Sequence, residues 1–419
     1  MNAITKDTSS TFYRDMVRLA LPIVLQNLIT TAVSSADVVM LGFVNQTALA
    51  AGSLASQIMF ILNLVYSGIS SGIIMLAAQY WGKKDTRTIE NIMGIGMRLS
   101  ILISLVFFIL AFFCPSLLMH IFTNDQTLLG PGKTYLRVVS FSYLFMSISQ
   151  VYLCTMRAIE RVIFATVVNG TALLLNIILN AVFIFGLFGA PQMGIAGVAL
   201  ATTIARFIEL GLCMIDSLRF KTLRFRPAAI FQHQKVLFGD FMRYSLPAFG
   251  NEVSWGVAFS MYSVIMGHLG SDMVAANAVV VVARNLGTVL CFGIANAGGI
   301  LIFLLRPVFM NMSDLSAVSQ GYLNIMLFIN MYYVIGQAMN SAVISGIFRA
   351  GGDSRWGFIC DFIDMWVYAV PLGFLSAFVL KLPPMWVYFL ICTDEFVKLP
   401  FVYRHYKSYK WLKNITREF

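Results

Sequence analysis

Residues 19–44 read LALPIVLQNLITTAVSSADVVMLGFV, an apolar run that a single carboxylate, Asp37, interrupts. A hydrocarbon core of about 30 Å is crossed by about 20 apolar residues in helical conformation. The run therefore predicts a membrane-spanning helix with an acidic group inside it. Because a charge in this environment is costly, it normally faces a cavity or a partner and indicates a functional site.

Runs of this kind recur along the whole chain. The 419 residues are 59% hydrophobic and 11% charged, whereas soluble domains carry about 25% charged residues. The pattern predicts an all-α polytopic membrane protein with about 11 spans. We place these spans at residues 19–42, 54–78, 99–122, 134–156, 162–188, 194–218, 243–267, 274–302, 320–347, 356–380 and 384–403.

The formal net charge of +10 comes from basic residues spread over short loops. This distribution follows the positive-inside rule and argues against nucleic-acid binding. It places the N-terminus and the central basic linker in the cytoplasm. The sequence has no CxxC pair, HExxH, Walker A or GxGxxG, so we expect no cofactor, no ATP as energy source and no enzymatic activity.

The chain is also internally repeated. A basic linker at 219–242 separates a predicted lobe at 1–218 from a second at 243–419. The matched positions are Pro22 and Pro247, Gly42 and Gly267, Ala51 and Ala276, and Gly68 and Gly293, and all four pairs have the same offset in sequence. Since both halves begin on the same side, the repeat is parallel, an arrangement that in transporters puts the substrate between the halves.

The repeat changes offset near residue 302. Beyond it, Pro115 matches Pro307 and Arg157 matches Arg349, and these two pairs share a second, smaller offset. The second half is thus shorter by one loop and most of one helix. We hypothesise a parent architecture of six plus six helices from which this chain has lost one crossing. The alternative is a fused span with a re-entrant piece.

Several stretches together resemble the multidrug and toxic compound extrusion (MATE) family, close to its bacterial branch. They are LALPIVLQNLITTAVSSADVVMLGFV, ALAAGSLASQ, GIIMLAAQYWGKKD, LLLNIILNAVFIFG, GIAGVALATTIAR and SGIFRAGGDSR. The resemblance implies two six-helix lobes and an alternating-access antiporter of the bacterial cytoplasmic membrane. Inward movement of Na⁺ or H⁺ would drive export of amphipathic, often cationic, compounds. We expect a monomer.

The first candidate site joins Asp37 to Asn176 and Asn180. The two asparagines are four residues apart and share a helix face. Asn180 precedes Gly186 by six residues and Asp37 precedes Gly42 by five, so the carboxylate and the amide lie at similar depth. Such a group binds a cation or changes protonation. The alternative is that Asp37 merely caps neighbouring backbone.

Family members carry an acid at the position of Asp37, and proton-coupled relatives often have a second Asp where Asn180 stands. Glu252 resembles the acid that Na⁺-coupled relatives use in the second lobe, and their partner Asp aligns with Asn340. Na⁺ could thus bind at Asp37 or at Glu252, but the acid and amide pairs are equally compatible with H⁺. Glu252 could instead pair with Arg284 or face solvent.

Asp361 and Asp364 are three residues apart and share a helix face. One is a candidate coupling site, and the other a candidate anion at the N-terminal end of its helix. Arg206 with Glu209, and Lys398 with Asp394 and Glu395, have the spacing of ion pairs within one helix.

Pro22 and Pro247 interrupt helical hydrogen bonds in the first span of each half. They are candidate hinges for alternating access. Alternatively, each proline simply ends the first turn of its helix.

Two other functions stay open at this point. A lipid-linked oligosaccharide flippase of the same broad superfamily would need basic groups in its cavity, whereas the intramembrane ionisable residues here are mostly acidic. A non-transporting remnant or partner subunit would follow if the shortened second half were incomplete.

Overall fold

The computed structural model describes residues 46–122, 126–219, 234–269 and 317–413. It also describes six isolated positions in a helix: Met273, Ala276, Asn277, Val280, Ala283 and Arg284. Over these residues the chain forms helices and no strand. The residues fall into two compact units, a first that ends at Phe249 and a second that begins at Gly250. Asp37, Pro22 and the interruption near residue 302 lie outside the described residues.

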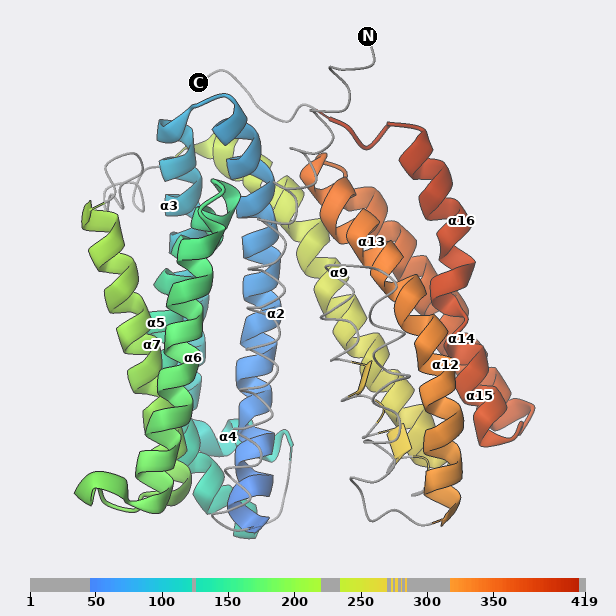
Figure 1. The fold of residues 1–419 in the computed structure, drawn as a ribbon, viewed down its shortest axis with the longest axis horizontal. Helices are drawn as coiled ribbons and strands as arrows, with labels where there is room; N and C mark the ends of the chain where they lie inside the picture. The colour runs from blue at the N-terminus through green and yellow to red at the C-terminus, as the bar shows by residue number, and fades with distance from the viewer. Residues whose placement is uncertain are drawn as a thin grey trace, which may run out of the picture. The chain divides into compact units, whose positions relative to one another are not determined.

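The first unit is a bundle that Figure 1 shows with its long helices side by side. Its elements are α2 (Gln46–Gly82), α3 (Thr86–Phe113), α4 (Pro115–His120), α5 (Gln126–Ala158), α6 (Val162–Phe185), η1 (Leu187–Gly189), α7 (Gly194–Arg219) and the start of α9 (Lys235–His268). Helix α5 packs against α2, α3, α6 and α7. Its buried face is rich in serine, and small side chains let membrane helices approach closely.

The second unit contains the end of α9 and two long helical segments with π-helical turns. The elements that follow α9 are α12 (Ala317–Ser341), η2 (Ala342–Phe348), α13 (Ser354–Ile363), η3 (Asp364–Ala369), α14 (Val370–Phe374), η4 (Leu375–Val379), α15 (Pro384–Ile391) and α16 (Asp394–Lys407). Elements η2, η3 and η4 are π-helices. Single π turns inside α-helices occur frequently at functional sites.

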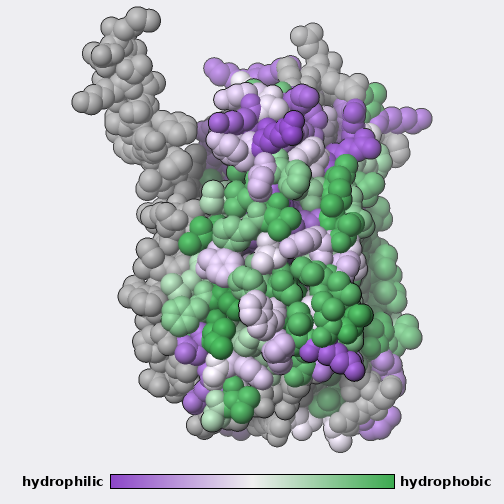
Figure 2. Space-filling view, turned by 90° about the vertical axis from the view of Figure 1, so that its right-hand side faces the viewer, coloured by the Kyte–Doolittle hydropathy of each residue, from purple (hydrophilic) through white to green (hydrophobic). Residues whose placement is uncertain are grey.

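Seven of the described helical segments are long and apolar enough to cross a membrane. They are Leu54–Gly82, Thr86–Phe113, Gln126–Ala158, Val162–Phe185, Gly194–Arg219, Ala317–Phe348 and Ser354–Val379. Figure 2 shows a band of apolar side chains with hydrophilic ones gathered above and below it. The large apolar side chains exposed from the second unit include Val367, Phe374, Trp386, Phe389, Phe396 and Phe401. The protein is an all-α polytopic membrane protein.

Several predicted span boundaries were wrong because helices extend into polar sequence. The third span, expected at 99–122, is α3, which begins at Thr86 and ends at Phe113. Asp85 caps it, since its carboxylate accepts the backbone N–H and the hydroxyl of Thr88. Such a cap stabilises a first turn that hydropathy alone does not detect.

The seventh span, expected from residue 243, begins at Lys235, so the second part of the predicted linker is helical. Pro247 consequently lies well inside α9, and the alternative that it ends the first turn was wrong. The last predicted span divides between α15 and α16 at Cys392 and Thr393. Helix α6 begins at Val162 and α13 at Ser354, and these two starts have the same offset as Arg157 and Arg349.

Candidate ion-coupling site

A cavity of about 230 Å³ opens inside the second unit. Helix α9 contributes Asn251 and Glu252, α12 contributes Asn340, and Arg349 follows η2. Helices α13 and α16 complete its polar wall with Asp361, Glu395 and Lys398. The cavity brings Glu252, Asn340 and Asp361 together, three residues that the sequence marked as candidates.

Lys398 is the centre of the charged part of this wall. Its Nζ atom lies 3.2 Å from Asp361 Oδ1, 3.3 Å from Asp364 Oδ2 and 3.0 Å from Glu395 Oε2. The whole residue is only 5% exposed. An ammonium group has three N–H donors, and each of the three carboxylates presents one oxygen to it.

Two asparagines hold the carboxylates in place. Asn251 Nδ2 donates to Asp361 Oδ2 at 3.0 Å. Asn340 Nδ2 donates to the Glu395 carboxylate at 2.8 Å and to its backbone carbonyl at 2.6 Å. The Oδ1 atoms of both asparagines are buried and accept no hydrogen bond. Carboxylate and amide oxygens are the donors that hard cations prefer.

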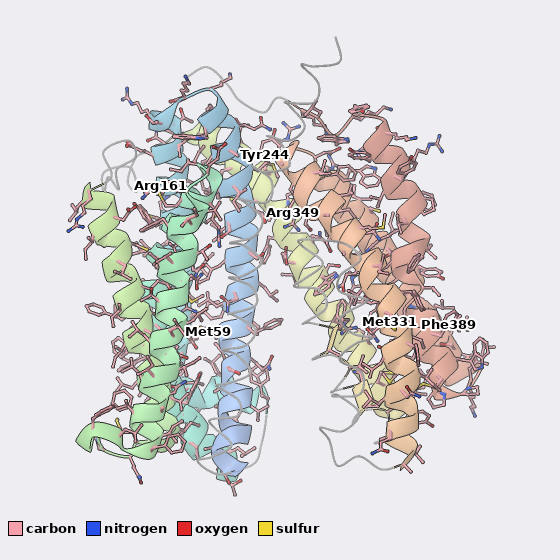
Figure 3. All side chains as sticks on the ribbon, in the orientation of Figure 1. Met59, Arg161, Tyr244, Met331, Arg349 and Phe389 are labelled. Atoms are coloured by element: carbon pink, nitrogen blue, oxygen red, sulfur yellow. The ribbon has the colours of Figure 1, made fainter. Side chains whose placement is uncertain are left out.

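Glu252 pairs with Arg349, whose guanidinium lies 3.1 Å from Glu252 Oε1. Arg349 follows the π-helix η2 and is labelled in Figure 3. The alternative pairing of Glu252 with Arg284 was wrong, because the Arg284 guanidinium lies over the Phe259 ring at 4.9 Å from its centroid. The true partner of Glu252 lies far along the chain on a different helical segment. Spacing within one helix therefore could not predict this pair.

The prediction that Asp361 and Asp364 share a helix face is confirmed, since both carboxylates contact Lys398. The idea that one of them is the N-terminal anion of its helix was wrong. Helix α13 begins at Ser354, so Asp361 lies two turns inside it and Asp364 begins η3. Asp353 occupies the cap position of α13 instead.

The acidic residues of this group outnumber its basic ones. Four carboxylates belong to it, those of Glu252, Asp361, Asp364 and Glu395, and two cations, those of Arg349 and Lys398. If all four carboxylates ionise, two negative charges are uncompensated within the group. Because charges are poorly solvated inside a membrane protein, such a group favours the uptake of protons or cations.

In the first unit, Asn176 and Asn180 share a face of α6 as predicted. Asn180 Nδ2 donates to Asn176 Oδ1 at 3.4 Å, and Asn176 Nδ2 donates to the Thr202 hydroxyl of α7 at 3.1 Å. Both asparagines are buried. Asn176 therefore links α6 to α7, and Asn180 bonds to it along α6.

The predicted ion pair of Arg206 and Glu209 is confirmed, with Arg206 Nη1 at 2.6 Å from Glu209 Oε2. The helical pair of Glu395 and Lys398 is confirmed as well. What sequence reasoning missed is that Lys398 also reaches two carboxylates of another helix. One signal was available, because Lys398 matches Arg206 at the offset that the repeat has beyond the interruption.

Comparisons with known proteins agree with this architecture. The MatE family model matches residues 22–182. The uncharacterized transporter YisQ of Bacillus subtilis is 24% identical, over 98% of this chain and 97% of that protein. The probable multidrug resistance protein NorM of Thermotoga maritima is 22% identical, over 100% of this chain and 97% of that protein.

Among solved structures, an outward-facing multidrug resistance MATE family transporter superposes with a TM-score of 0.82 at 17% identity, covering 94% of this chain and 96% of the other. Over nearly its whole length the chain is thus similar to MATE family transporters. This family is one of transporters and not of enzymes. The charged cavity lies among the described helices of the second unit.

This chain is shorter than the full-length relatives it matches. The alignment with the Thermotoga NorM extends over 463 residues and takes in 100% of this chain, which has 419 residues. The aligned positions in excess of the chain's own length have no counterpart in it. A shorter chain is what the smaller repeat offset beyond residue 302 predicts. The interruption itself lies outside the described residues.

Proposed function

We propose that this protein is a cation-coupled antiporter that exports amphipathic, often cationic, compounds across the bacterial cytoplasmic membrane by alternating access. The observation that carries the proposal is the surplus of carboxylates around the cavity of the second unit. The multidrug resistance names of the NorM relatives support the choice of cargo.

The cavity is suited to an ion. Its volume of about 230 Å³ is below the roughly 300–1,000 Å³ of pockets for drug-sized ligands. A proton or a small hydrated cation fits, and the organic cargo must bind elsewhere. An inward-moving cation can supply about 2.3 kcal/mol per charge per 100 mV of membrane potential.

The charge of the site also separates the proposal from a flippase for lipid-linked oligosaccharides. A pyrophosphate group requires basic side chains in the cavity. Here both cations are already engaged, Lys398 by three carboxylates and Arg349 by Glu252. The net charge of the cavity therefore suits a coupling cation and not a pyrophosphate group.

Reconstituted transport tests the proposal. Export of the fluorescent cation ethidium from proteoliposomes is measured under an imposed Na⁺ gradient, an imposed H⁺ gradient, or neither. We expect one gradient to drive export, and Asp361→Asn or Asp37→Asn to reduce the driven rate at least about tenfold. Glu160→Gln, at an exposed loop position, is the control and should keep the wild-type rate.

Export that needs no gradient would rule out coupling. Export by Asp361→Asn and Asp37→Asn at the wild-type rate would remove both carboxylates from the mechanism. A protein that folds but moves no cationic probe under any gradient would favour the non-transporting remnant.

A further inference from the structure

Lys398 occupies the place that a small bound cation would take in this site. Its ammonium nitrogen lies 3.0–3.3 Å from one oxygen of each of three carboxylates. These come from three different elements, Asp361 from α13, Asp364 from η3 and Glu395 from α16. All of its N–H donors are thereby matched with acidic oxygens.

The site nevertheless offers more oxygens than the ammonium uses. Asn251 and Asn340 line the same cavity, are 6% and 2% exposed, and each has an Oδ1 atom that accepts no hydrogen bond. Neither oxygen of Asp364 accepts a hydrogen bond either, although Oδ2 is within ion-pair distance of Lys398. Unsatisfied buried acceptors of this kind are rare and point to a ligand.

With Lys398 in place there is no vacancy for a metal ion at its centre. Among the described residues, no group of three or more His, Cys, Asp or Glu side chains is suited to hold one. An alkali cation coordinated by the same oxygens would lie within about one ion-pair distance of Nζ and would be strongly repelled. A lysine ammonium is a compact point charge on a flexible stem, so it carries the same single positive charge as such a cation.

We propose that Lys398 is a tethered cation that fills the alkali-cation position of the second unit and thereby excludes Na⁺. Protons are then the coupling ions that the carboxylates of this unit can still take up. The part of this inference that concerns ion coupling rests on the proposed function. The exclusion of Na⁺ by Lys398 concerns binding alone, so it can be measured without transport.

The experiment measures ²²Na⁺ binding to purified protein in detergent. All variants carry Asp37→Asn, which removes the other candidate Na⁺ site. With Lys398 intact we expect no saturable Na⁺ binding. In Lys398→Gln we expect about one Na⁺ per chain, bound at least about tenfold more tightly than in the parent. Lys407→Gln, an exposed lysine on the same helix, is the matched control and should behave like the parent.

A second variant protects the test against misfolding. Lys398→Gln combined with Asp364→Asn removes one cation and one anion, so the net charge of the cluster is unchanged. It should also bind Na⁺, and adding Asp361→Asn should abolish that binding. A purely structural lysine would give variants of lower stability whose stability is the same in Na⁺ and in choline.

Two results would overturn the inference. One is saturable Na⁺ binding with Lys398 intact that disappears when Asp361 is changed to Asn. The other is a folded Lys398→Gln, or its charge-conserving double variant, that binds no Na⁺. Failure of ion-driven export would instead overturn the proposed function and leave the binding result unaffected.

Discussion

Glu209 has a fully buried carboxylate in the first unit, and both of its oxygens are engaged. Arg206 lies 2.6 Å from Oε2, and the Ser149 hydroxyl donates to Oε1 at 2.6 Å. Removing one partner of a buried ion pair leaves the other charge poorly solvated, which costs more than the pair itself contributes. The intact pair therefore contributes to the stability of the first unit.

At this scale we predict that Arg206→Met lowers the free energy of unfolding by about 3–5 kcal/mol, because it strands the Glu209 carboxylate. The double variant Arg206→Met with Glu209→Leu should recover most of this loss. Thermal unfolding in detergent, followed by tryptophan fluorescence, measures both. Equal stability losses in the single and double variants would mean that packing, and not the stranded charge, is responsible.

The pair of Glu252 and Arg349 differs in environment from that of Glu209. Its side chains are 27% and 15% exposed and border the cavity. A partly solvated pair of this kind contributes little to stability. Breaking this pair should therefore change the stability of the second unit little.

Between elements, the seam of α6 and α7 depends on a glycine. A Cβ atom on Gly197 would lie 2.7 Å from Phe183 Cβ and 3.3 Å from the Phe183 carbonyl oxygen. These atoms cannot move away without shifting the helices. The close approach at Gly197 is part of the seam across which Asn176 donates to Thr202.

We predict that Gly197→Ala lowers the free energy of unfolding by about 1–3 kcal/mol, the usual cost of overpacking a buried contact. Gly211→Ala is the matched control on the same helix, because a Cβ there meets nothing within 4 Å. It should be neutral or slightly stabilising, since alanine favours the helix. Thermal unfolding measures the stability of both variants. Equal stability of Gly197→Ala and Gly211→Ala would contradict the close contact at Gly197.

For the whole molecule, the tail following α16 provides the most direct test of topology. The last turn of α16 contains Arg404 and Lys407, and the tail contains Lys410. The tail is anchored to the loop before α13 through Lys413, whose Nζ lies 2.8 Å from Asp353 Oδ1. Positive charges beside spans favour the cytoplasmic side.

We therefore predict that a reporter fused after Phe419 is cytoplasmic, on the same side as the predicted N-terminus. Paired alkaline phosphatase and green fluorescent protein fusions measure this. Only the fluorescent fusion should be active. An active phosphatase would mean that the chain after the interruption near residue 302 is inverted, and that the second unit cannot take part in the family's mechanism.

Much of the architecture follows from sequence alone. Hydropathy predicted a polytopic all-α membrane protein, and helical periodicity predicted the pairing of Arg206 with Glu209, of Glu395 with Lys398, and the shared face of Asn176 and Asn180. Each of these is a relation within one helix, where a spacing of three or four residues settles which side chains are neighbours. The positions of Asp37 and Pro22 stay sequence predictions.

Only the tertiary structure decided which helices share their charges. It placed Asp361 and Asp364 of one helix on Lys398 of another, and it paired Glu252 with Arg349. Such contacts depend on how each helix is rotated and packed, and on the π turns that shift the register of its faces. No local spacing encodes them, so the sequence predicted Lys398 as a partner within its own helix and not as the centre of the acidic group.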